Sequence, residues 1–186
     1  MAHIYTYGIC RKCKDLGNLQ PFNLKKERRK MSKITTNTDL IERKCDDVYY
    51  TEGMKIAYKL LIVCLIPKYQ QAVGLAHNQI GGTKSVFIAK LETITGTNKW
   101  QTFINPTITD KSKNTYISDE GCMSFPNKPN KVKRHNWIEL KHQVKARNDV
   151  EGLAFTTERF EGFDATIIQH ECDHLNGIHI HNKKER

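Results

Sequence analysis

Three residues near the C-terminus have the types and spacing of a hydrolytic metal site: His170, Glu171 and His174. Two histidines four positions apart on a helix face the same way, so their imidazole nitrogens can bind one metal ion. A glutamate next to the first histidine can take a proton from a metal-bound water. The same spacing could place two histidines on a solvated helix, but the apolar neighbours Ile167 and Leu175 argue against full solvation. The pattern therefore predicts metal-dependent hydrolysis.

A catalytic metal site also needs a third protein ligand and an open position for water. His179 and His181 are candidates in a segment close to the extended zinc-peptidase pattern, but that pattern requires histidine where the chain has Ile180. Cys122 is the other candidate, in the segment Glu-Gly-Cys-Met-Ser, because a thiolate is a strong ligand for Fe²⁺ and Zn²⁺. The spacing alone leaves both candidates open.

The metal motif falls on the second of two helical patterns in the chain. This pattern runs from about Gly162 to Asn176, and Gly177 suits a C-terminal cap. The first pattern runs from Thr38 to about Tyr69, and Pro67 is expected to stop it. The sequence therefore predicts one helix early in the chain and a second helix that positions both histidines.

The chain between these helices is predicted to form short strands and turns. Apolar or alternating runs predict strands at residues 85–89, 101–104 and 137–141. Residues 73–79 are rich in turns, and residues 117–126 are expected to be irregular. The fold class predicted is α+β, in which short β-sheets surround a central metal-binding helix that carries the His-Glu-x-x-His motif.

Length and composition limit the class of protein. A chain of 186 residues favours one domain, and no apolar run approaches the ~20 residues of a membrane-spanning helix. The N-terminus lacks a signal-peptide core and the chain has six cysteines, so we expect a cytoplasmic protein with reduced thiols and no membrane partner. Lys and Arg number 30 against 20 Asp and Glu, and the net charge of +10 favours contact with polyanions.

The first part of the chain is set apart by its basic character. It contains Cys10 and Cys13, a weak metal-binding signal without a second pair, and Met31 opens a second plausible start. We therefore predict a basic N-terminal extension at residues 1–33 and a catalytic domain at residues 34–186.

Three segments that occur in order resemble the motifs of the peptide deformylase family. They are Gly-Leu-Ala-His-Asn-Gln at residues 74–79, Glu-Gly-Cys-Met-Ser at 120–124 and Gln-His-Glu-Cys-Asp-His at 169–174, and the resemblance covers about residues 40–182. It implies a peptide-deformylase-like fold and one divalent metal ion, commonly Fe²⁺, with Zn²⁺, Ni²⁺ or Co²⁺ as alternatives. The metal ligands that it implies are Cys122, His170 and His174.

The resemblance also implies a reaction and a substrate. The substrate is a nascent peptide with an N-formylmethionine, and hydrolysis of the formyl amide releases formate and a free methionine amine. Glu171 is implied as the acid and base of this reaction. The Gln79 side chain and the backbone N–H of Met123 are implied as donors to the developing oxyanion.

Substrate-binding residues carry over from the same family. Val73 and Gly74 match positions that pair with the peptide backbone as an added strand. Glu120 belongs to the second motif, and Arg134 matches an arginine near the mouth of the cleft, although a solvated surface charge is an alternative interpretation. The positions that match the methionine pocket are Phe163, Thr166 and Ile167.

The chain departs from the family pattern at several positions. His77 stands where a small residue is usual and could be a fourth ligand, a proton relay or a surface residue, and Thr166 is polar for a methionine pocket. The chain ends soon after His174, so it resembles compact members without the C-terminal helix that docks on the ribosome.

Two other functions are open to the same sequence. A zinc endopeptidase would use His179 or His181 as the third ligand. A basic ribosome- or RNA-binding module would carry an inactive metal site, and ribosomal RNA would suit the charge, while no DNA partner is expected.

Overall fold

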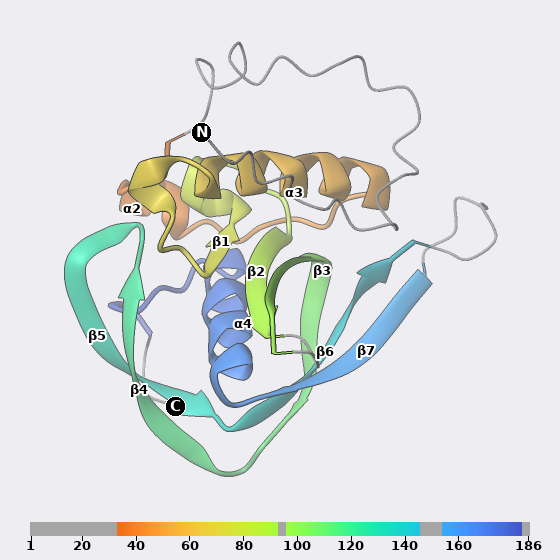
Figure 1. The fold of residues 1–186 in the computed structure, drawn as a ribbon, viewed down its shortest axis with the longest axis vertical. Coiled ribbons are helices and arrows are strands. Elements are labelled where there is room, and N and C mark those ends of the chain that lie inside the picture. The colour runs from red at the N-terminus through yellow and green to blue at the C-terminus, as the bar shows by residue number, and fades with distance from the viewer. Residues whose placement is uncertain (1–32, 93–95, 146–153, 184–186) are drawn as a thin grey trace, which may run out of the picture. The chain divides into compact units, whose positions relative to one another are not determined.

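The computed structural model describes residues 33–92, 96–145 and 154–183 of the chain. These residues form antiparallel β-sheets and few helices, as expected for the α+β class (Figure 1). Residues 1–32 make up nearly all of the predicted N-terminal extension, and they lie outside the described residues together with Cys10 and Cys13.

Five strands form one antiparallel sheet in the order β1-β2-β3-β6-β7. Their bounds are β1 Gly74–Ala76, β2 Val86–Glu92, β3 Asn98–Lys111, β6 Trp137–Val144 and β7 Ala154–Glu161. The strands predicted at residues 85–89 and 137–141 are confirmed, and the strand predicted at 101–104 is part of the much longer β3. Because β1 is an edge strand, it pairs with β2 on one side only.

The second sheet is a hairpin of β4, Thr115–Cys122, and β5, Phe125–His135. The prediction that residues 117–126 are irregular is therefore wrong. Both strands carry exposed polar residues, and a register shift between Glu120 and Cys122 interrupts the pairing, so the alternation expected of a strand is hidden.

The first helical pattern is divided into separate elements. These are α2 Thr38–Ile41, α3 Tyr50–Cys64 and the short 3-10 helix η2 Pro67–Tyr69. A single helix over residues 38–69 is therefore a wrong prediction. The backbone between α2 and α3 serves long-range bonds instead, since the amide of Cys45 donates to the Leu175 carbonyl and the amide of Val48 donates to Asn105 Oδ1. A continuous helix would give up these bonds.

Helix α4, Gly162–Leu175, confirms the second helical pattern and carries the His-Glu-x-x-His motif. Gly177 follows it with a φ of 72°, as predicted for a C-terminal cap. A Cβ at this position would lie 2.3 Å from the carbonyl oxygen of Glu42, so glycine is required twice over. None of the helices in the described ranges is long and apolar enough to cross a membrane.

Two helices pack on opposite faces of the five-stranded sheet, and β2 is shared between them. Val86 and Ile88 join the hydrophobic cluster of α3, whereas Phe87 and Ala89 join the cluster of α4. Successive side chains of a strand point to opposite faces, which explains this division. The sheet therefore holds α4 against a buried apolar layer and fixes the direction in which its polar residues point.

Candidate metal centre

Cys122, His170 and His174 form a cluster at the junction of the hairpin and α4. Their sulfur and nitrogen atoms all lie within 4.8 Å of one another, and Cys122 Sγ is 3.2 Å from His174 Nε2. The two imidazoles project from one face of α4, and the thiol lies at the end of β4. The fold thus brings together the three residues that the family resemblance implies as ligands.

The other histidines considered as third ligands lie outside this cluster. His179 Nε2 is 2.9 Å from Glu42 Oε1, and its ring is tilted against that of Phe125 at a centroid distance of 4.5 Å. His181 Nε2 is 3.1 Å from the Lys128 carbonyl oxygen. Both histidines are therefore engaged elsewhere, and Cys122 is the third member of the cluster.

Glu171 is buried beside the cluster, and its Oε2 atom has no hydrogen-bond partner. Burial raises the pKa of this carboxyl to about 7, against the opposing charges of His170 and Arg134. On its other side lies Gly74, where a Cβ would fall 2.3 Å from Glu171 Oε1. Because Gly74 has no side chain, the edge strand β1 can pass directly over the Glu171 carboxylate.

Gln79 points its side-chain amide at the cluster from the 3-10 helix η3, His77–Ile80. Its Oε1 accepts a hydrogen bond of 2.8 Å from the Ala76 amide, which fixes the rotamer. Its Nε2 then lies 3.5 Å from Cys122 Sγ and 3.3 Å from Ser124 Oγ. Met123 follows Cys122 in the turn of the hairpin.

Behind the cluster, Glu120 and Arg134 form a buried ion pair with two hydrogen bonds, of 2.6 and 2.7 Å. Glu120 Oε2 also lies 2.9 Å from His170 Nδ1, and Arg134 Nη1 donates to Asp173. Asp173 in turn accepts a bond from Lys183. Arg134 is only 1% exposed, so the alternative that it is a solvated surface charge is wrong.

This network controls the protonation of the groups that it touches. Burial would raise the pKa of Glu120, but the hydrogen bonds from Arg134 and His170 hold it at about 2. Burial would lower the pKa of His170, but its bonds with Cys122 and Glu120 raise it to about 10. Burial takes the pKa of His174 well below its usual value. Glu120 is thus a fixed anion that holds the His170 ring in place.

The donor set fits a divalent metal ion. One sulfur and two ring nitrogens converge from two elements, and a carboxylate oxygen of Glu171 is buried without a protein partner. A thiol with two imidazoles is a donor set that suits Fe²⁺ and Zn²⁺.

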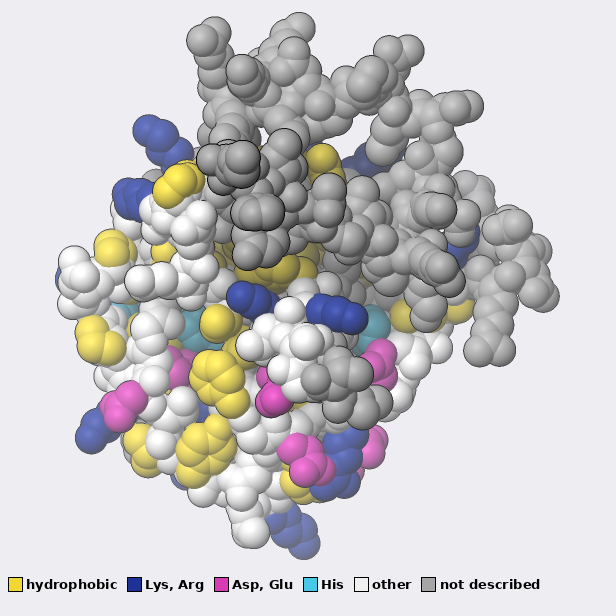
Figure 2. Space-filling model, viewed as in Figure 1, with side chains coloured by type: hydrophobic (Ala, Val, Ile, Leu, Met, Phe, Trp, Pro, Cys, Tyr) yellow, Lys and Arg dark blue, Asp and Glu magenta, His cyan; other side chains and the backbone are white. Residues whose placement is uncertain are grey.

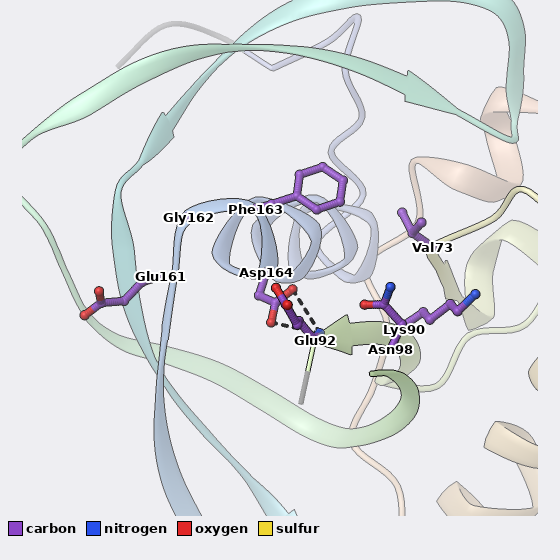
Figure 3. Close-up of a pocket in the computed structure, with 8 residues that line it drawn as sticks. All are labelled: Val73, Lys90, Glu92, Asn98, Glu161, Gly162, Phe163 and Asp164. Carbon is purple, nitrogen blue, oxygen red and sulfur yellow. Dashed lines mark hydrogen bonds between the residues drawn. The ribbon is translucent and has the colours of Figure 1, made fainter. Parts of the chain in front are cut away.

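Two of the predicted substrate-binding residues border an open hollow at the N-terminal end of α4. Figure 3 shows Val73 and Phe163 on either side of this hollow of about 710 Å³. Val73 is 40% and Phe163 is 68% exposed. The hollow is also lined by polar or small residues from β2, β3, β7 and α4: Lys90, Glu92, Asn98, Glu161, Gly162 and Asp164.

The remaining predicted residues of the methionine pocket, Thr166 and Ile167, are buried on α4. The hydroxyl of Thr166 is hydrogen-bonded to that of Tyr116 and to the Gly162 carbonyl oxygen. Sequence reasoning missed Tyr116, because nothing in its local sequence marks it. It also missed Asp173, which could have been found because it follows His170 by three positions on the same helix.

His77 does not belong to the metal cluster within the described part of the chain. Its Nδ1 accepts a bond of 3.2 Å from the Lys84 amide, and a Cβ at Gly82 would lie 2.1 Å from its Nε2. His77 therefore packs against a glycine turn, and the interpretation that it is a fourth ligand is not supported.

A helix with two imidazoles, a thiol from a separate hairpin and a buried carboxylate define the class of a metal-dependent hydrolase. The chain matches the family model described as polypeptide deformylase over residues 12–186. It is 34% identical over 143 residues to peptide deformylase 1 of Clostridium perfringens, across 75% of this chain and 88% of that protein. It is 32% identical over 131 residues to the peptide deformylase of Thermotoga neapolitana, across 70% and 72% of the two chains.

The fold leads to the same family. The crystal structure of peptide deformylase from Thermotoga maritima matches with a TM-score of 0.69 and 25% identity, across 84% of this chain and 99% of that one. The chain belongs to the peptide deformylase family, whose members are metal-dependent. The resemblance recognised in the sequence is confirmed, and the endopeptidase and RNA-binding alternatives are not favoured.

Proposed function

We propose that this chain removes the formyl group from N-formylmethionyl nascent peptides with one metal ion held by Cys122, His170 and His174. The observation that carries this proposal is the convergence of one thiol and two imidazoles beside the unpartnered carboxylate of Glu171. Helix α4 is then the central metal-binding helix of the fold. We propose Fe²⁺ as the ion, as the family resemblance implies, and the sulfur and imidazole donors are compatible with it as with Zn²⁺.

Such an ion, when bound, lowers the pKa of water and polarises the formyl oxygen. Glu171 takes a proton from the water that adds to the formyl carbon, and it delivers this proton to the departing amine when the C–N bond breaks. Burial raises the pKa of this carboxyl, which favours its accepting the proton and holding it until the amine departs. The products are formate and a peptide with a free methionine amine.

The developing negative charge on the formyl oxygen needs fixed donors. The Nε2 group of Gln79 supplies one, because its bond from the Ala76 amide leaves only the N–H₂ end free to face the cluster. The backbone N–H of Met123 supplies a second donor from the turn after Cys122. We propose that Glu120 and Arg134 position the metal ligands, rather than bind substrate as the resemblance implied, because Glu120 contacts His170 and is paired with Arg134.

The edge strand β1 gives the peptide a direction. Gly74 touches Glu171, so the formyl end lies at this residue when the peptide pairs with the outer edge of β1 as an antiparallel strand. The register pairs Gly74 with Ala89, so one step further out brings Val73 and Lys90. The residues that follow the methionine therefore run into the hollow bordered by Val73 and Phe163.

The site of action follows from the substrate. Nascent peptides are made on ribosomes, so we propose that the protein acts in the cytoplasm. The basic extension at residues 1–33 and the net charge of +10 suit contact with ribosomal RNA.

The reaction is tested by formate release from formyl-Met-Ala-Ser with protein loaded anaerobically with Fe²⁺. We expect turnover by the wild type and a loss of at least about 1,000-fold in Glu171→Gln at unchanged metal content. Glu139→Gln, in strand β6 away from the cluster, is the matched control and should keep full activity. Equal rates in wild type and Glu171→Gln would overturn the assignment of Glu171, and no release by metal-loaded wild type would overturn the function.

A further inference from the structure

The segment that follows α4 carries His179 and His181, the two histidines that lie outside the metal cluster. We refer to residues 179–183 as the C-terminal clamp. We propose that Ile180 is a positioning residue for Cys122, and that the two histidines hold the clamp against the β4–β5 hairpin. The proposal rests on the metal centre proposed above and adds residues that hold one of its ligands in place.

Cys122 needs such support because it lies on a different element from the other two ligands. Among the strands that the structure describes, the β4–β5 hairpin has no pairing with the five-stranded sheet, whereas α4 shares a hydrophobic cluster with that sheet. Cys122 is also the last residue of β4, where a register shift interrupts the pairing within the hairpin. The sheets therefore do not fix the distance between the thiol and the imidazoles, and side-chain contacts must do so.

Ile180 meets Cys122 in a small apolar cluster at the end of the hairpin. The cluster consists of Cys122, Val132 and Ile180, all buried, and Phe125 packs against it. Ile180 is only 3% exposed. Its backbone is tied to the hairpin as well, since Asn130 Nδ2 donates to the Ile180 carbonyl oxygen. Ile180 thus fills space at the thiol that a smaller side chain would leave empty.

Both histidines of the clamp contact the residue that is paired with Cys122. In the register of the hairpin this residue is Phe125. The ring centroids of His179 and His181 lie 4.5 and 5.1 Å from that of Phe125, and His181 Nε2 is 3.1 Å from the Lys128 carbonyl oxygen. In Figure 2, histidine side chains lie next to hydrophobic ones on the side of the molecule where Figure 1 places the hairpin. The two rings therefore hold the turn of the hairpin from its β5 strand.

The clamp is fixed to α4 at both of its ends. Gly177, with its positive φ, turns the chain directly after the helix, and Lys183 donates to Asp173 of α4. Between these points, Asn182 Oδ1 accepts a hydrogen bond of 2.7 Å from the His179 amide, which closes the turn. The clamp, dark blue in Figure 1, therefore joins the helix that carries the imidazoles to the hairpin that carries the thiol.

The test measures how fast Zn²⁺-loaded protein loses its metal to EDTA, and Zn²⁺ is used because it has no redox chemistry. Ile180→Ala leaves a cavity at Cys122, so we expect the rate of metal loss to rise on the order of tenfold. Ile180→Val keeps most of the side chain and should stay within about twofold of wild type. The matched control is Ile56→Ala. Ile56 is 4% exposed and packs in the hydrophobic cluster of α3, so this variant should lose similar stability and hold its metal as wild type does.

A second measurement follows the thiol itself in metal-free protein. Iodoacetamide alkylates accessible thiols, and mass spectrometry of the peptide that contains Cys122 gives the rate at this residue. Cys122 is 9% exposed, so it should react slowly in wild type and severalfold faster in Ile180→Ala. His181→Ala removes an exposed side chain and its contact with Phe125, and it should change the rate in the same direction by less.

Equal rates of metal loss and of alkylation in wild type and Ile180→Ala would overturn the inference. Equal increases in Ile180→Ala and Ile56→Ala would overturn it too, because Ile180 would then act only through overall stability. If Ile180→Ala does not fold, the comparison of His181→Ala with wild type decides. None of these rates depends on turnover, so a failure of the clamp leaves the proposed function to be judged by formate release.

Discussion

The two sides of the metal cluster differ in how completely their polar groups are paired. Behind it, Glu120, Arg134 and Asp173 satisfy one another through short hydrogen bonds. In front of it, an oxygen of Glu171 is buried with no partner. Pairing makes buried charges tolerable, whereas unpaired buried groups cost stability and are kept where chemistry needs them. We therefore expect the back of the site to act as scaffold and the front, with Glu171, to carry the reaction.

The largest effect should come from removing the sulfur of the cluster. Cys122→Ala leaves two imidazoles as ligands, so we expect substoichiometric metal after dialysis and a fall in kcat/KM on the order of 1,000-fold. Metal analysis and formate release measure the two effects. Cys172→Ala changes a buried thiol on α4 that faces the core, and it should keep its metal. Equal metal content in the two variants would break the distinction between front and back.

Breaking the scaffold should cost stability rather than chemistry. Arg134→Met leaves the buried Glu120 without its cation, while Asp173 keeps Lys183, so the free energy of unfolding should fall by about 3–5 kcal/mol. Lys84→Met breaks the exposed pair with Asp46 and should cost less than about 1 kcal/mol. Urea unfolding of the metal-free proteins makes the comparison. A cost for Arg134→Met as small as that of the control would show that the network is not structural.

A smaller effect, on catalysis and not on stability, is expected when a single methyl group is added at Gly74 in front of the cluster. Gly74→Ala places a Cβ against the Glu171 carboxylate, which must move, and kcat/KM should fall about 10–100-fold with little change in stability. Gly121→Ala adds the same group where no atom lies within 4 Å, and it should be silent. Rates and melting temperatures for both variants decide the matter. A loss of stability without loss of rate would place Gly74 in the scaffold instead.

The smallest effect concerns His77, a histidine outside both regions. Burial lowers the pKa of His77 below 6.5, although the bond with the Lys84 amide opposes this shift. The pKa of the ring is lower in the folded protein than in the unfolded chain, so the unfolded chain takes up a proton first. The folded protein therefore loses stability as the pH falls below 6.5. Unfolding measured between pH 7 and 5 should therefore be steeper for wild type than for His77→Gln. Parallel curves would contradict this assignment.

Local pattern was enough to predict α4, its cap at Gly177 and the two histidines on one face. It could not choose between Cys122 and the histidines at 179 and 181, since the choice depends on which segment the fold returns to α4. The family resemblance made that choice, and the cluster agrees with it. The chemistry of a site is thus readable from short motifs when they are taken together.

Tertiary contacts account for what the sequence did not reveal. The β4–β5 hairpin was missed because its exposed strands carry no apolar alternation. The position of Tyr116 on β4 was missed for the same reason. Arg134 was open to interpretation as a surface charge because its partners, Glu120 and Asp173, lie on two other elements. The break after α2 was missed because Cys45 bonds to the end of α4, far away in sequence.

Strand β2 links the two hydrophobic clusters and so affects how the protein unfolds locally. It gives Val86 and Ile88 to one hydrophobic cluster and Phe87 and Ala89 to the other, so neither cluster can open while the other keeps its strand. Amide hydrogens of α3 and α4 should therefore exchange with solvent through one common opening of the sheet. Helix α4 is then stabilised not only by its own cluster but also by the packing of α3 on the opposite face of the sheet.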